Sequence, residues 1–276
     1  MAVSIGVVFA AFESSTEDIL SYLITFQNSI QNSFEFRLLS APTPDPFISL
    51  LQRIVPPTHE EAEGEVDAFV ARVKAHDASE AASYGLMAQP VDKIVLFSNT
   101  RFSDNFYYIG CPTWSVVALS GWQTEFAPPS IVEYYLSILV TSALDAVGAG
   151  IDRHFNTRGC IFDFNASLSD KRLSVLSGHI CADCKMKIEK MAGSQVVADA
   201  LVLLQRSWLG SAQQPSEVAF TVKKLGYDLF HTTGVRPTLK ERLLTTFEQE
   251  GLKNALNITF QLLLAIALVI IGLKKQ

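Results

Sequence analysis

The sequence predicts an α+β fold, with helices packed on a sheet and one hydrophobic helix at the C-terminus. Two observations support the globular part: short apolar runs such as Val3–Ala10 and Lys93–Ser98 are typical of buried strands, and stretches with helical spacing lie between them. A third supports the terminal helix, because residues 255–273 are uncharged and largely apolar.

Composition favours one sizeable core and argues against a nucleic-acid partner. Of 276 residues, 49% are hydrophobic and 18% are charged, and the formal net charge is -6 with no long basic run. Met1–Phe9 is apolar but lacks a basic n-region, so we expect a first strand there rather than a signal peptide. The cysteines should then meet a reducing cytosol, where metal binding is favoured over disulfides.

The first half of the chain alternates strand and helix patterns. After the first strand, cap residues at 14–18 begin a helix to about Ile30, and Phe34–Leu39 alternates like a second strand. Five prolines favour a loop over much of 41–57. His59, Glu60 and Glu61 suit the acidic start of a second helix, whose apolar stripe is Val66, Phe69, Val70 and Val73.

The next elements lead to a central helix. After the strand Lys93–Ser98, residues 105–122 should hold two more strands, separated by Cys111-Pro112. Ser130 and Glu133 have capping-box spacing, and the helix that follows, Ile131–Val147, is apolar nearly all round. Such a helix should be buried at the centre of the domain. Gly148 and Gly150 should end it.

The remaining sequence suggests three parts. Further helices are expected between about Asp183 and Leu209 and over Thr238–Gln249, and Ser211–Ser216 resembles a linker. We therefore expect a domain at 1–210, a linker with a juxtamembrane helix at 211–254 and a transmembrane anchor at 255–273.

Three cysteines and a histidine have the spacing of a zinc site. Cys181 and Cys184 form a C-x2-C pair, and His154 and Cys160 lie upstream with five residues between them. Two short-range pairs joined by a loop are typical of tetrahedral structural zinc sites, and four protein ligands leave no position for a substrate. The sequence therefore predicts a structural zinc held by His154, Cys160, Cys181 and Cys184.

Alternatives to this site remain open. His179 lies two residues before Cys181 and competes with His154 as the fourth ligand. The cysteines could instead be buried apolar thiols, or Cys181 and Cys184 a redox pair. Cys111 lies in a strand pattern and is expected to be a core residue. Three aspartates lie around the loop that carries the predicted ligands: Asp152, Asp163 and Asp170. Their side chains are expected to be solvated or to have capping roles.

The C-terminal segment predicts a single-pass membrane anchor. Its nineteen residues, 255–273, would extend about 28 Å as a helix, close to a hydrocarbon core of about 30 Å. Lys274 and Lys275 follow, and upstream basic residues favour a cytoplasmic large domain. Asn257 and Gln261 share a helix face and could link copies in a homo-oligomer. A buried core helix or an oligomer-forming helix is the alternative.

The order of these parts resembles the archaemetzincins, a family of small zinc peptidases with the pattern HExxHxxGxxHC, a further cysteine and a later C-x2-C pair. In that family the histidines hold a catalytic zinc on a buried helix that follows a mixed sheet, and the cysteines hold a structural zinc, so the resemblance implies a mixed sheet here too. Gly150 matches the glycine of the pattern, His154 stands at its first cysteine, Cys160 is one residue beyond the second, and Cys181 and Cys184 match the final pair.

The catalytic positions of the pattern do not match. Ala143, Val147 and Arg153 stand where the three histidines would be, and Leu144 stands at the general-base glutamate. None of these side chains can bind zinc or take a proton from water. The resemblance therefore implies a degenerate, metzincin-like member without the catalytic residues.

These observations lead to competing hypotheses. The first is a membrane-anchored, catalytically inactive peptidase-like module that acts as a sensor, adaptor or effector on an unknown protein partner, with bacterial defence as one setting. The second is a membrane-tethered zinc-dependent hydrolase with an unrecognised active site. The third is a soluble zinc protein whose tail docks on a partner.

Overall fold

The computed structural model describes residues 2–227, apart from residues 11, 13, 105, 120–128, 149, 156–158 and 166–167. The chain divides into two units, Met1–Thr232 and Thr233–Gln276, and the described residues belong to the first. The expected helix Thr238–Gln249 and the expected anchor at 255–273 lie outside the described residues. No helix in the described part is long and apolar enough to cross a membrane.

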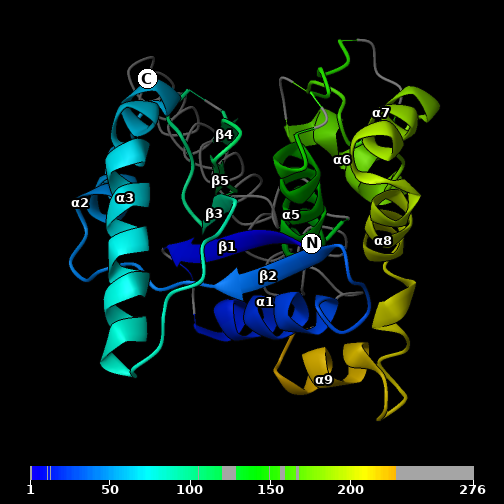
Figure 1. The fold of residues 1–276 in the computed structure, drawn as a ribbon, viewed down its shortest axis with the longest axis horizontal. Coiled ribbons are helices and arrows are strands. Elements are labelled where there is room, and N and C mark those ends of the chain that lie inside the picture. Colours follow the sequence, from blue (N-terminus) through cyan, green and yellow to red (C-terminus); the bar gives the residue numbers. More distant parts are fainter. Residues whose placement is uncertain are drawn as a thin grey trace, which may run out of the picture. The chain divides into compact units, whose positions relative to one another are not determined.

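A five-stranded mixed sheet forms the centre of the fold, which confirms the predicted α+β class (Figure 1). Its order is β2-β1-β3-β5-β4. The four strands β1, β2, β3 and β5 are parallel, whereas β4 pairs antiparallel with β5 at one edge. The strands are β1 (Val3–Ala10), β2 (Phe34–Leu38), β3 (Lys93–Ser98), β4 (Tyr108–Gly110) and β5 (Trp114–Ala118).

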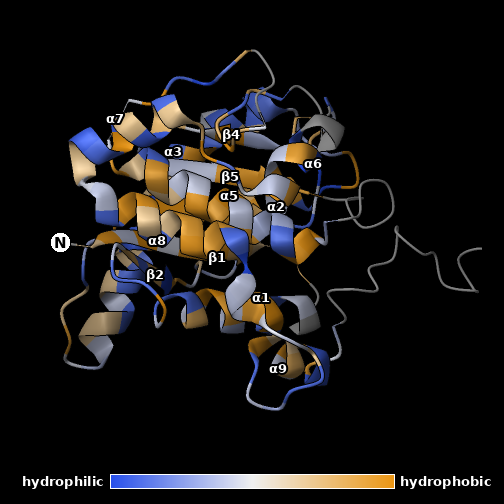
Figure 2. Ribbon diagram, turned by 90° about the vertical axis from the view of Figure 1, so that its right-hand side faces the viewer, coloured by the Kyte–Doolittle hydropathy of each residue, from blue (hydrophilic) through white to orange (hydrophobic). Residues whose placement is uncertain are grey.

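Helices cover both faces of the sheet, which explains the nearly continuous apolar strands. Ile5 and Val7 of β1 pack with α1 (Ser14–Gln27) and α5 (Ile131–Ala146). The alternate residues Val8 and Ala10 pack with α2 (Pro46–Leu51) and α3 (His59–Ser83). Figure 2 shows hydrophobic residues on the sheet and on the helices around it. The predicted stripe of α3 is buried on this second face.

The proline-rich segment after β2 contains a helix that sequence reasoning missed. Asp45 caps α2 and accepts hydrogen bonds from the amides of Phe47 and Ile48 at 2.7 and 3.4 Å. Arg72 of α3 also donates to Asp45, with Nε and Oδ2 2.6 Å apart. Pro46 fits because the first helical position needs no N–H donor. Much of 41–57 is loop, as expected, and the helix Pro46–Leu51 was not predicted.

The central helix α5 is buried as predicted. Every residue from Ile131 to Leu144 is buried except Glu133. The capping box of Ser130 and Glu133 is present and fixes the start of the helix. Gly148, at φ 79°, follows its end. The helix therefore directs the chain into the loop that carries His154 and Cys160.

The remaining described helices complete this side of the domain. Gly193, at φ 92°, separates two helices in the range where helices were expected. Val218 and Val222 are buried in the same cluster as α5, so the compact unit continues into the range assigned to the linker. The elements are α6 (Leu168–Ser177), α7 (Ala182–Ala192), α8 (Ser194–Gln205), η1 (Ser207–Leu209) and α9 (Val218–Lys224).

Candidate metal centre

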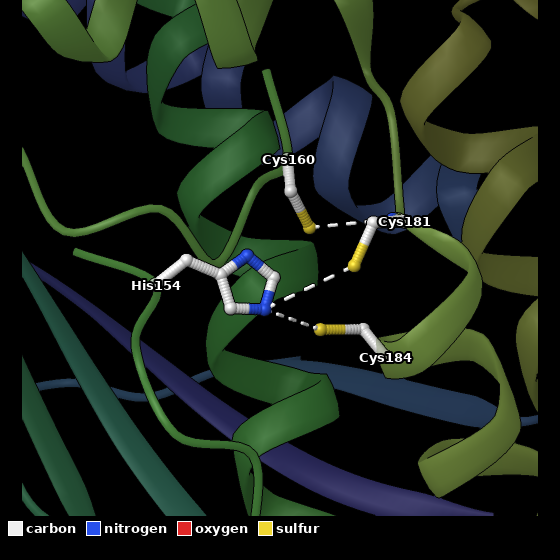
Figure 3. A group of neighbouring side chains, drawn as sticks. All are labelled: His154, Cys160, Cys181 and Cys184. Carbon is white, nitrogen blue, oxygen red and sulfur yellow. Dashed lines mark hydrogen bonds between the residues drawn. The ribbon is translucent and has the colours of Figure 1, made fainter. Parts of the chain in front are cut away.

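The structure brings the four predicted ligands together (Figure 3). His154 and Cys160 lie in the loop after α5, Cys181 precedes α7 and Cys184 lies in its first turn. One ligand atom from each residue falls within 4.8 Å of the other three. The three cysteines are buried and the histidine is half-buried, so the site is closed to most of the solvent.

The distances within the cluster suit a tetrahedral zinc ion. His154 Nε2 lies 3.2 Å from Cys184 Sγ and 3.9 Å from Cys181 Sγ. Cys160 Sγ accepts a hydrogen bond from the Cys181 amide, with the two atoms 3.4 Å apart. With Zn–S bonds of about 2.3 Å and Zn–N bonds of about 2.0 Å, neighbouring ligand atoms lie roughly 3.5 Å apart. The donor set therefore fits zinc.

Backbone pairing holds the two ligand segments in place. His154 donates its amide to Phe162 O at 3.1 Å and accepts from the Phe164 amide at 2.8 Å, so its strand-like segment pairs with the residues after Cys160. The Ile161 amide donates to His179 O at 2.9 Å. Cys160 is thereby placed beside the segment that leads into Cys181 and α7.

Asp163 orients the histidine, a role that sequence reasoning missed. Its Oδ1 lies 3.1 Å from His154 Nδ1, which leaves Nε2 facing the sulfur atoms. Its Oδ2 accepts a hydrogen bond from the Cys160 amide at 3.0 Å. A carboxylate behind a metal-binding histidine fixes the ring and its tautomer. Asp163 is 4% exposed, which corrects the expectation of a solvated or capping aspartate. The sequence signal for this role was the position of Asp163, three residues after Cys160.

The competing residues lie elsewhere. The side chain of His179 is exposed and does not belong to the four-residue cluster. Cys111 follows β4, is partly exposed, and has its sulfur 3.3 Å from Thr113 Oγ1. Cys111 contacts the second core cluster without being fully buried. His154, and not His179, is thus the histidine that the fold places among the cysteines.

Burial opposes ionisation of the thiols in the metal-free protein. Desolvation and the nearby Cys160 raise the pKa of Cys184 strongly, and desolvation also raises the pKa of Cys160. Burial acts on Cys181 too, but the backbone amide of Cys184 and the neighbouring thiols lower its pKa overall. A divalent cation would stabilise the thiolates that burial disfavours, as zinc does when it binds deprotonated cysteine.

The four positions that the sequence resemblance sets against catalytic residues hold core or ion-paired side chains. Ala143 and Leu144 are 0% exposed and pack in the main core. Val147 is partly buried against the same core. Arg153 donates to Asp145, with Nη2 and Oδ2 2.6 Å apart. These four side chains supply neither metal ligands nor a general base.

Comparison with known proteins gives a distant structural likeness. No protein-family model and no curated protein matches this chain. The archaemetzincin from Methanopyrus kandleri aligns with a TM-score of 0.42 and 13% identity over 68% of this chain and 94% of its own. The archaemetzincin from Archaeoglobus fulgidus aligns with a TM-score of 0.37 and 14% identity over 67% and 99%. The similarity is one of fold arrangement.

Proposed function

We propose that this protein is a non-catalytic, membrane-anchored module that acts as a sensor, adaptor or effector. The proposal rests on the central helix α5, whose side chains belong to the hydrophobic core. Ala143 and Leu144 are fully buried, and Arg153 is engaged with Asp145, where a zinc peptidase would need its ligands and base. The domain then supplies a stable shape and surface rather than a reaction.

The zinc in this proposal is structural. His154, Cys160, Cys181 and Cys184 would hold it, and all four positions of a tetrahedral ion would be taken by protein. A closed shell contributes to folding and leaves no open position for water or substrate. The ion would link the loop after α5 to the first turn of α7.

The proposed anchor supplies the output of the module. Residues 255–273 have the length and composition of a membrane helix and are followed by two lysines. The polar pair Asn257 and Gln261 would face neighbouring copies and favour self-association. The partners in this proposal are the lipid bilayer, further copies of the chain and a protein that the cytoplasmic domain contacts.

The alternative, a membrane-tethered hydrolase, requires a second metal or another catalytic group. The test is a digest of a broad peptide library by the full-length protein, with and without added zinc. We expect no cleavage. The matched control is the same protein with Cys160, Cys181 and Cys184 changed to serine. Chelator-sensitive cleavage that persists in this variant would establish a catalytic metal outside the cluster and contradict the proposal.

A further inference from the structure

A cavity of about 190 Å³ lies beside the metal centre but is separate from the metal cluster. Its walls come from β4 and the residues before it, from α5, from the loop that carries His154 and Cys160, and from α6. Half of the ten lining residues are aromatic or aliphatic, namely Phe106, Tyr107, Tyr108, Ile138 and Phe164. An apolar cavity of about 150 Å³ is enough to bind benzene. This cavity can therefore hold a group of aromatic size.

Two cationic side chains line the same cavity. Lys171 of α6 is only 6% exposed, and its Nζ donates to Ile161 O at 2.6 Å. Within the described part of the chain, that carbonyl is the only hydrogen-bond partner of the ammonium, which has three protons to donate. Arg153 uses Nη2 to bind Asp145 Oδ2 and keeps further N–H donors. The cavity thus combines an apolar lining with N–H donors for which the described residues supply no further acceptor.

The positive charges of Lys171 and Arg153 repel one another in this buried, low-dielectric setting. Burial first, and then the charge of Arg153, lower the pKa of Lys171 to about 8, while Asp163, Cys160 and Asp145 act in the opposite direction. Lys171 is still mostly protonated at pH 7. An anion in the cavity would offset the desolvation and the repulsion together, because it would interact with both charges.

The remaining charges limit the ligand to a single negative charge. Asp145 neutralises much of the charge of Arg153 through its short ion pair. Asp163 lines the cavity, but its oxygens are bound to the His154 ring and the Cys160 amide. Counted together, the charges of Lys171 and Arg153 are balanced by those of Asp145 and Asp163, so a carboxylate would be held by the nearby N–H donors and a second negative charge on the ligand would be disfavoured.

We propose that this cavity binds a carboxylate attached to an apolar, preferably aromatic, group. The carboxylate would accept hydrogen bonds from Lys171 and from the planar guanidinium of Arg153, whose fork matches carboxylate geometry. The rings would contact the apolar body. A free organic acid and the C-terminal residue of a peptide share this chemistry. The inference goes beyond the proposed function and does not depend on it.

Calorimetry with the full-length protein in detergent tests the ligand class. The probes are 3-phenylpropionate and its neutral amide, and a tripeptide that ends in phenylalanine with a free or an amidated C-terminus. We expect each free carboxylate that reaches the cavity to bind at least about tenfold more tightly than its amide. Binding of the free acid alone identifies a small molecule, and binding of the free-ended peptide identifies a peptide terminus. Equal affinity of acid and amide in both pairs, or tighter binding of phenyl phosphate than of phenylpropionate, overturns the proposal.

Three variants test the location of the site. Lys171→Met and Arg153→Gln should each weaken phenylpropionate binding at least about tenfold, because each removes a charge-assisted hydrogen bond. The control is Lys190→Met, which makes the same change on the exposed surface of α7 and should leave affinity unchanged. Phe164→Ala changes a half-exposed ring of the lining and should also weaken binding. Unchanged affinity in both Arg153→Gln and Phe164→Ala overturns the proposal even if Lys171→Met fails to fold.

Discussion

Arg153 binds Asp145 across the end of α5, with Nη2 and Oδ2 2.6 Å apart and both side chains partly buried. The next residue, His154, has its ring in the metal cluster. Two adjacent residues therefore connect the loop to the central helix on one side and to the three cysteines on the other. This relationship explains how the metal centre is positioned relative to the core.

The first prediction concerns metal content. The purified protein should contain about one zinc ion per chain, since four ligand atoms gather at one point. Cys184→Ser and His154→Ala should each remove most of the metal and lower the thermal stability, because structural zinc binding is coupled to folding. His179→Ala is the matched control and should retain both. Elemental analysis and thermal unfolding give the answer, and a stable wild type without metal would contradict the site.

The second prediction concerns Asp163. Asp163→Asn removes the charge that faces His154 Nδ1 and should lower zinc affinity about 10–100-fold, the range found for carboxylates behind metal ligands. With zinc in excess, the stoichiometry should stay at one. Competition with a chelator of known affinity measures the change. Asp152→Asn is the control, because Asp152 lies in the same loop with a side chain 93% exposed. An equal effect of the two variants would show that Asp163 has no special role.

The third prediction concerns acid stability at the start of α2. Burial raises the pKa of Asp45, but hydrogen bonds from Arg72 and from the amides of Phe47 and Ile48 outweigh it and lower the pKa below 3.8. A lowered carboxyl pKa contributes stability that is present above the unfolded value and is lost as pH falls through the folded one. Asp45→Asn should therefore cost about 1–3 kcal/mol at pH 7 and less below about pH 4.

Urea unfolding of wild type and variant across this pH range measures the effect. Asp77→Asn is the control, because Asp77 pairs with Arg37 at 3.4 Å with both side chains partly exposed. A surface ion pair of that kind contributes about 0–1 kcal/mol. A cost at Asp45 that is small at pH 7 or does not change with pH would contradict the assigned role of its charge.

The fourth prediction concerns the anchor. A chain truncated before Ala255 should be soluble and folded, because the unit Met1–Thr232 contains both described core clusters and the metal cluster. The full-length chain should pellet with membranes and resist extraction by salt. Fractionation of both forms, with circular dichroism of the shorter one, is the measurement. A truncated form that still pellets with membranes, or that loses its fold, would count against the anchor.

The sequence by itself indicated most of the local elements, the three cysteine ligands and two candidate histidines. Apolar runs, the capping box at Ser130 and Glu133, and the spacing of His154, Cys160, Cys181 and Cys184 are signals that neighbouring residues carry. Such signals depend on helix and strand periodicity and on short loops, so they can be recognised without any knowledge of distant contacts. The sequence also showed that Ala143 and Leu144 cannot bind a metal, because their side chains carry no ligand atom in any fold.

Only the tertiary structure decided which residues meet. His154 rather than His179 joins the cysteines because the loop pairs with itself through the amides of His154 and Phe164. Asp163 became visible as a partner of the histidine only in this pairing, and Lys171 and Arg153 line one cavity only because α6 packs beside α5. Contacts between residues far apart in the chain follow from the packing of whole elements, and no local periodicity records them.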